Sequence, residues 1–213
     1  MCDEKFREGN TRLSTLFVIG FVWCSMLFVS TQAQAGNGSE QMVHNLPSDP
    51  RAIVIQWRTK GGLAGRDEAY ADLTIRADGS VTIGPRLAAG KIIEGHLTAE
   101  RVQDLLSMAI DDNDFFEVDT EQVEEAVRAE MEKRKALARE ENKVIAVPRG
   151  PPYLDAGTTV ILIAVDGKRN EISYHGLFAA ARDFPNITEL GKLRAIEVEM
   201  RNLAEDIVVS MRP

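Results

Sequence analysis

Alternation of apolar and polar residues, the period of a half-buried β-strand, recurs at several places along this chain. In the first such segment, Ile53, Ile55 and Trp57 share one face. Two pairs of segments are joined by an Asp-Gly dipeptide, Asp78-Gly79 and Asp166-Gly167, which is typical of tight β-hairpins. The segment before the second Asp-Gly is continuously apolar, as expected for the centre of a sheet. The predicted strands are 52–59, 70–77, 80–84, 158–165 and 171–175.

A helical period begins after Thr98, a residue type that caps helix N-termini well. The apolar residues on the face that follows are Val102, Leu105, Leu106 and Ala109. The acidic run 111–114 opposes the negative end of the helix dipole, so we expect this helix to end near Ile110. A calcium loop is not expected there, because no glycine supplies its sharp turn. Phe115-Phe116 should return the chain to the core.

A second apolar stripe predicts a terminal helix that begins at Asn186 or Thr188 and ends near Val209. Its members are Leu190, Leu193, Ile196, Met200, Leu203 and Ile207. The stripe is long enough to cover a broad part of the sheet.

Residues 120–143 have high helix propensity, but acidic and basic residues alternate there and large apolar residues are few. Val123, Val127 and Met131 form only a thin stripe, and Glu130 and Arg134 are spaced for an ion pair. We interpret the segment as a solvated helix within a charged insertion at about 118–150. A partner-binding coiled coil is the alternative, although the stripe is short for one.

Strands joined by hairpins and followed by helices predict helices packed on one face of an antiparallel sheet. The fold class is therefore α+β: an antiparallel sheet of about five strands with two packed helices and an inserted charged helix. We expect a single domain over 52–213. Residues 36–51 are polar and contain Pro47 and Pro50, so a flexible linker is predicted there.

The N-terminus has the three parts of a secretory signal peptide in the right order. Basic residues come first, Leu13–Val29 is uncharged and mostly apolar, and Ala33-Gln34-Ala35 offers the small residues that signal peptidase accepts. We therefore expect residues 1–35 to be a signal peptide and the protein to be exported, to the periplasm or the medium. The alternative is a retained membrane anchor through 13–29, which is short for the about 20 residues that a span needs.

Cysteine content and net charge limit the classes of chemistry and of binding partner that we expect. Both cysteines, Cys2 and Cys24, lie in the predicted signal peptide, so we expect an exported domain with no disulfide and no thiol chemistry. The formal net charge is −8, which argues against binding nucleic acid or anionic lipid through bulk charge. After cleavage of the signal peptide we expect no contact with the membrane.

No residue pattern specifies a reaction. His44, His96 and His175 are isolated in the sequence, and no serine-nucleophile motif is present. The glycine-rich stretch 61–65 lacks the Lys-Ser/Thr of a phosphate-binding loop. We therefore expect a non-catalytic protein without a metal or cofactor.

The same stretch carries a resemblance. The segment 53–66 (IVIQWRTKGGLAGR) resembles the opening of the emfourin family, small bacterial inhibitors of thermolysin-like metalloproteases such as protealysin. The similarity continues in outline over 52–209, through the helix start Leu97-Thr98-Ala99-Glu100, the Phe-Phe pair, an apolar strand with its Asp-Gly turn, and a terminal helix. Leu63 replaces the usual aromatic residue, the hairpin at 73–83 is enlarged, and the charged insertion is extra.

The resemblance implies a protease-binding loop made of Gly61, Gly62, Leu63, Ala64 and Gly65, of which all but Leu63 match the family's motif. A loop of glycines is thin enough to enter a cleft that side chains would block. The alternative is that the glycines only permit a tight bend or bulge. As a function, the alternative to metalloprotease inhibition is an envelope interaction module whose contact surface is the charged helix 120–143.

Overall fold

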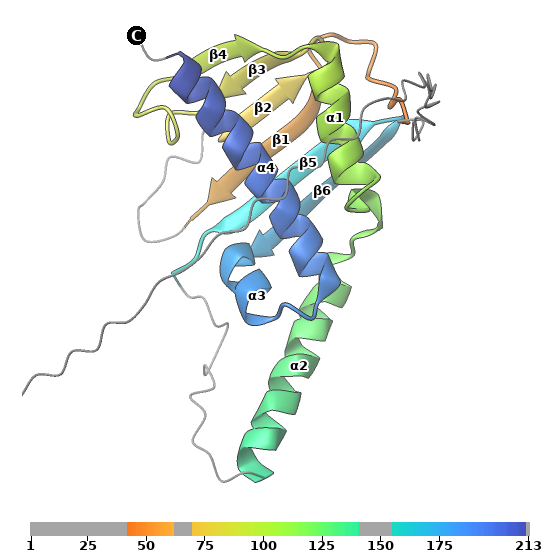
Figure 1. The fold of residues 1–213 in the computed structure, drawn as a ribbon, viewed down its shortest axis with the longest axis vertical. Helices are drawn as coiled ribbons and strands as arrows, with labels where there is room; N and C mark the ends of the chain where they lie inside the picture. Colours follow the sequence, from red (N-terminus) through yellow and green to blue (C-terminus); the bar gives the residue numbers. More distant parts are fainter. Residues whose placement is uncertain (1–41, 62–69, 141–154, 212–213) are drawn as a thin grey trace, which may run out of the picture. The chain divides into compact units, whose positions relative to one another are not determined.

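The computed structural model describes residues 42–61, 70–140 and 155–211. These residues form a six-stranded antiparallel sheet in the order β4-β3-β2-β1-β5-β6 (Figure 1). The strands are β1 (Ile53–Lys60), β2 (Leu73–Arg76), β3 (Ser80–Ile83), β4 (Ile93–His96), β5 (Thr158–Val165) and β6 (Lys168–His175). The helices are α1 (Ala99–Ile110), α2 (Thr120–Glu140), α3 (Leu177–Asp183) and α4 (Thr188–Ser210), with a 3-10 turn, η1 (Phe115–Glu117). The α+β class and the antiparallel sheet are confirmed.

The sheet has six strands where about five were predicted, because β4 adds an edge. Its four residues, IEGH, contain a glycine and are too few for alternation to be recognised. Pairing with β3 along its whole length, from Ile93 to His96, makes this segment a strand. The helix α4 packs over this strand, since a Cβ at Gly95 would make an ordinary contact, 3.6 Å, with Cγ2 of Ile207.

A β-bulge in β1 changes one predicted face. Ile53 pairs with Arg76 and Ile55 with Ile75, so Val54 is an extra residue on this strand. Ile53 is therefore 36 % exposed, whereas Val54, Ile55 and Trp57 are fully buried. The prediction that Ile53 shares a buried face with Ile55 is wrong, because simple alternation does not foresee a bulge.

Both Asp-Gly hairpins are present where the sequence predicted them. In the first, Gly79 has a φ of 83° and its N–H donates to the carbonyl of Arg76. In the second, Asp166 and Gly167 both have positive φ, 53° and 70°, as the two central residues of a type I′ turn require. The continuously apolar strand β5 is an interior strand between β1 and β6, but it lies next to the edge and not at the centre of the sheet, which β2 and β1 occupy.

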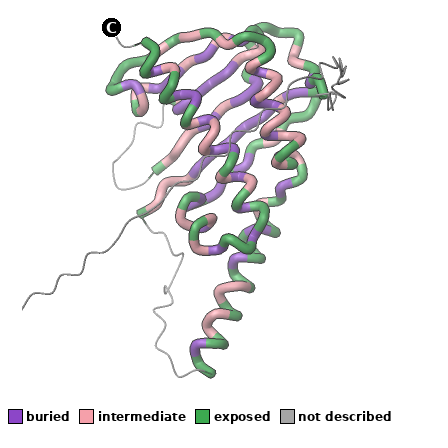
Figure 2. The backbone as a smooth tube through the Cα atoms, viewed as in Figure 1, coloured by how far each residue is buried: buried purple, intermediate pink, exposed green. Residues whose placement is uncertain are grey.

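One face of the sheet is covered by α1 and α4, which cross it side by side (Figure 1). The strands' inward residues and the helices' apolar stripes form one buried cluster, and the buried positions are the purple segments along the strands and helices in Figure 2. Its largest members include Trp57, Phe115, Ile161, Leu106 and Leu193. The Thr98 hydroxyl caps α1 by accepting the Arg101 N–H, as predicted. Burial of these two helices against one sheet face is the main source of stability.

The charged helix α2 is attached to the domain at its beginning. Val123 and Val127 are buried and Met131 packs against the core, while most other residues of α2 are exposed. The expected ion pair between Glu130 and Arg134 is present at 3.4 Å. The last residues of the predicted insertion, 141–150, lie outside the described part of the chain.

The short helix α3 was not predicted. Its seven residues, LFAAARD, span too few turns to show a helical period. Leu177 and Ala180 are buried, and α3 lies beside the beginning of α4 (Figure 1). Burial against α4, rather than local sequence preference, therefore fixes this helix.

Residues 44–47, here called the N-terminal strap, are fixed to the domain. The main-chain N–H and carbonyl of His44 pair with the side-chain amide of Gln103 on α1, both at 2.9 Å. At the β5–β6 turn, the N–H of Asp166 donates to the carbonyl of Asn45. Within the predicted linker 36–51, polar side chains from distant elements thus satisfy the backbone of the strap. Residues 36–41 lie outside the described part, and the flexibility of the linker stays a prediction.

His44 joins the strap to two carboxylates. Its side chain is only 7 % exposed, with Nδ1 3.0 Å from Asp166 and Nε2 3.3 Å from Asp111. Asp166 also accepts hydrogen bonds from the N–H and the side-chain amide of Asn45. The strap, the end of α1 and the β5–β6 turn are thus connected by one polar network.

Among the described helices, none has the length and the apolar character needed to cross a bilayer. The predicted signal peptide, 1–35, lies outside the described residues.

We predict that Asp166→Asn weakens acid sensitivity. The pKa of Asp166 lies below its ordinary value of 3.8 in the folded protein, chiefly because the carboxylate accepts the Asn45 N–H and then because it faces His44. The stabilisation is therefore complete above the unfolded-state pKa and is lost as the pH falls through the lower folded-state pKa.

Urea midpoints measured at neutral pH and at about pH 3 should differ more for the unaltered protein than for Asp166→Asn. Asp155→Asn, which changes an exposed carboxylate, serves as the control and should match the unaltered protein. Equal pH dependence with and without Asp166 would contradict this prediction.

Candidate interaction site at the base of the β1–β2 connection

The predicted partner-binding residues lie in the connection between β1 and β2. Gly61 follows β1 directly, is exposed, and has a φ of 66°, in the left-handed region that favours glycine. Gly62, Leu63, Ala64 and Gly65 lie outside the described residues. The structure therefore describes the base of this connection, where the chain leaves β1 and enters β2.

Asp72 ties the two sides of the base together. It is 3 % exposed; its N–H donates to the carbonyl of Trp57 at 3.0 Å, and its carboxylate accepts the N–H of Thr59 at 2.8 Å. Arg86, from the segment between β3 and β4, donates to both carboxylate oxygens at 2.5 and 2.6 Å. A bidentate pair of this kind fixes both orientation and distance. We call Asp72, Arg86 and the Thr59 N–H the base clamp.

Two glycines outside the connection let the backbone pack tightly around its base. A Cβ on Gly84 would lie 2.1 Å from the carbonyl oxygen of Ala71, which is closer than real Cβ atoms come to backbone. A Cβ on Gly157 would lie 2.6 Å from Cγ2 of Thr59. Both ends of the connection are therefore held against neighbouring backbone where a side chain would not fit.

Beside the base clamp, Trp57 is fully buried and faces two guanidinium groups. Those of Arg86 and Arg201 each lie 5.5 Å from the centre of its rings. Arg201 is in turn paired at 2.8 Å with Glu197, a carboxylate only 3 % exposed on α4. Trp57 thus connects Arg86 of the base clamp with Arg201 of α4 through two cation–π contacts.

Sequence reasoning missed Asp72, Arg86, Gly84 and Gly157. Asp72 stands before a short alternating run, where an acidic residue is commonly a turn residue. Arg86 lies in a segment with no periodicity at all. The pairing joins residues from two different connections, so no local pattern could have indicated it.

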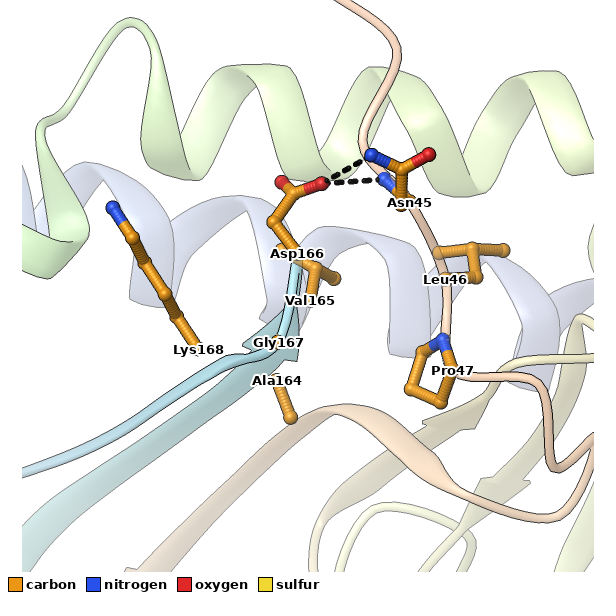
Figure 3. A pocket seen from close by; sticks show the side chains of 8 residues that line it. All are labelled: Asn45, Leu46, Pro47, Ala164, Val165, Asp166, Gly167 and Lys168. Atoms are coloured by element: carbon orange, nitrogen blue, oxygen red, sulfur yellow. Dashed lines mark hydrogen bonds between the residues drawn. The ribbon is translucent and has the colours of Figure 1, made fainter.

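A hollow, the second candidate site, lies between the N-terminal strap and the β5–β6 turn. It has a volume of about 330 Å³ and is lined by strap residues 45–47 and by turn residues 164–168 (Figure 3). Both carboxylate oxygens of Asp166 already accept hydrogen bonds, from Asn45 and His44. That carboxylate already holds the strap in place, so this hollow is a weaker candidate than the base clamp.

The charged helix α2 meets β6 through Tyr174. Burial raises the pKa of this phenol, and the nearby Glu124 carboxylate raises it further. Farther along α2, Arg134 donates to the carbonyl of Asp183 at 2.9 Å and its guanidinium lies 4.6 Å from the ring centre of Phe184. Beyond that contact, Leu137 is 48 % exposed. The far part of α2 therefore offers a charged surface with one exposed apolar residue.

The three histidines do not converge. His44 belongs to the strap network, His96 is exposed on the edge strand β4, and His175 ends β6 with its Nδ1 3.3 Å from the hydroxyl of Thr158. Within the described ranges, no three acidic, histidine or cysteine side chains gather in a way that could hold a metal ion.

Comparison with known proteins gives no further assignment. No protein-family model matches this chain, no curated protein matches it, and no solved structure matches its fold. The geometry of the base clamp and the sequence of the connection above it are therefore what a functional proposal rests on.

Proposed function

We propose that this protein is a non-catalytic inhibitor of a thermolysin-like metalloprotease, and that it binds the protease with residues 61–65. The observation that carries the proposal is the base clamp, in which the buried Asp72 carboxylate, paired with Arg86, joins the two described ends of the glycine-rich connection. The resemblance of 53–66 to the emfourin family supplies the class of target.

The physical reasoning concerns the cost of binding. An inhibitory segment must enter a cleft that is built for an extended peptide, and a segment with few side chains is thin enough to do so. Ordering a glycine-rich segment is costly, because glycine loses more backbone entropy than other residues. Fixing both ends of the segment lowers that cost before binding, which raises affinity without any added contact.

The scaffold under the connection fits this role. Thr59 and Asp72 fix the two ends, Gly84 and Gly157 allow neighbouring backbone to pack against them, and Trp57 joins the group to the core. An exported protein without disulfides would need noncovalent stiffening of this kind.

A stoichiometric inhibition assay tests the proposal directly. Protein expressed from the full chain and purified should slow thermolysin-like proteases at equimolar amounts, and Gly62→Trp should abolish the inhibition because the indole blocks entry into the cleft. Gly191→Trp is the matched control: the same bulky side chain is added on α4, where a Cβ meets nothing within 4 Å. Absence of inhibition across a panel of such proteases would overturn the proposal.

The base clamp predicts a separate, graded effect. Asp72→Asn keeps the shape of the side chain but removes its charge, and should raise the inhibition constant about tenfold by loosening both ends of the connection. The free energy of unfolding should fall by about 3 kcal/mol, the range for breaking a buried charge pair.

Glu171→Gln is the control for Asp72→Asn. It removes a carboxylate of β6 from a more exposed ion pair, in which Glu171 meets Arg58 of β1 at 3.5 Å across the intervening strand β5. Surface pairs contribute little, so both stability and inhibition should be nearly unchanged. If Asp72→Asn inhibits as well as the unaltered protein, the clamp does not prepare the connection for binding.

The exposed end of α2 favours one other candidate, an envelope interaction module that binds its partner through this helix. Leu137, 48 % exposed among charged residues, is the side chain that such a contact would bury. Leu137→Ser separates the two ideas. If the glycine-rich connection contacts the protease, this substitution should leave protease inhibition unchanged. If α2 is the contact surface, the substitution should reduce binding of the partner protein.

A further inference from the structure

Within the described residues, β4 is an edge strand whose outer main-chain groups have no strand partner. The N–H of Leu97 donates to the carbonyl of Gly79, so the main-chain groups of Leu97 point toward β3. In a strand, the N–H and C=O of one residue point to the same side, and this side alternates from one residue to the next. The main-chain groups of Gly95 and Ile93 therefore also point toward β3. The main-chain groups of Glu94 and His96 therefore point away from the sheet. They lie at its edge, since β4 ends the strand order.

The strand β4 has no lysine, proline or bulge, and its short length and the charged Glu94 are the only protective features of an edge strand that it has. Edge strands are commonly protected by lysine, proline or a bulge. The opposite edge, β6, begins with Lys168 and Arg169, whereas β4 has the sequence IEGH and pairs with β3 in unbroken register. Exposed apolar side chains lie around β4: Ile92 immediately precedes it, and the Sδ-linked methyl carbon of Met211 lies 4.0 Å from the Cβ position of Gly95.

The polar side chains on β4 are complementary to those of a second, antiparallel copy. When Gly95 of one copy lies opposite Gly95 of the other, Glu94 lies opposite His96 twice, once on each side of the symmetry axis. Both side chains are exposed and lie on the face of the sheet away from Gly95. Carboxylate and imidazole then form two cross-strand pairs, and Ile93 lies opposite Leu97. A shift of two residues in one direction would instead place Glu94 against Glu94.

We propose that β4 is a dimerisation edge, and that two copies of this chain join their sheets through antiparallel β4 strands in the register Glu94 to His96. In this register the outward N–H and C=O of Glu94 bond to those of His96 in the second copy, and the reverse. The interface is isologous, as a closed dimer requires. Ile92 and Met211 are 48 % and 55 % exposed in the single chain and lie beside this edge, where the second copy can pack against them.

A second copy fits this edge better than an unrelated extended peptide. Self-pairing satisfies both the outward main-chain groups and the two charged side chains with the same four residues of each copy. A peptide of arbitrary sequence would satisfy only the main chain, and would leave the choice of register open.

Sedimentation velocity of the protein expressed from the full chain tests the proposal. We expect a reversible dimer whose population rises with concentration. Glu94→Lys should raise its dissociation constant about tenfold, because both cross-strand pairs change from complementary to repulsive or neutral. The exchange Glu94→His with His96→Glu should restore dimer formation, since it keeps the pairing and reverses its direction.

Glu125→Lys is the matched control, with the same charge change at an exposed position of α2. A protein that stays monomeric at all concentrations up to several hundred micromolar overturns the proposal, as does a dimer that Glu94→Lys leaves unchanged. A monomer that binds only a different protein at β4 also overturns it. Because β3 and β2 separate β4 from β1, loss of the dimer and loss of protease inhibition are measured independently.

Discussion

The whole structure depends on one constraint: the sheet has a single face that α1 and α4 together must keep from water. The pairing of β1 with β5 places Trp57 opposite Ile161 on this face, and both are almost completely buried. Leu106 on α1 and Leu193 on α4 close over the same cluster. Hydrophobic burial on this scale selects one register for the strands, because a slip of one residue would turn the apolar set outward.

Polar contacts at two places on the sheet fix segments that hydrophobic burial alone does not hold in position. In both places an aspartate carboxylate accepts a main-chain N–H from a distant segment: Asp72 accepts that of Thr59, and Asp166 accepts that of Asn45. In both places a second side chain completes the site, Arg86 at one and His44 at the other. The first connection fixes the base of a glycine-rich segment, and the second fixes the N-terminal strap. Charged hydrogen bonds to backbone are suited to this, because they set position as well as energy.

The proposed inhibitor and the proposed dimer use different properties of the same sheet. The inhibitor proposal uses the β1–β2 connection, whose two described ends are held together by the base clamp. The edge strand β4 is prepared by its outward main-chain groups and by the carboxylate and imidazole side chains of Glu94 and His96, which can form hydrogen bonds with each other. Strand order keeps the two apart, since β2 and β3 lie between β1 and β4.

The sequence by itself determined the elements with a clear period or turn: both Asp-Gly hairpins, the apolar strand β5, the Thr98 cap, and the helices α1, α2 and α4. These depend on local backbone preference and on side chains that repeat at fixed spacing. Only the tertiary structure decided the rest. The strand β4 and the helix α3 are too short for a period, and the bulge at Val54 breaks one. The base clamp joins Asp72 to Arg86, and the strap joins His44 to Asp111 and Asp166. The base clamp and the strap network each join residues that are far apart in the sequence. These residues become neighbours only once the sheet has formed.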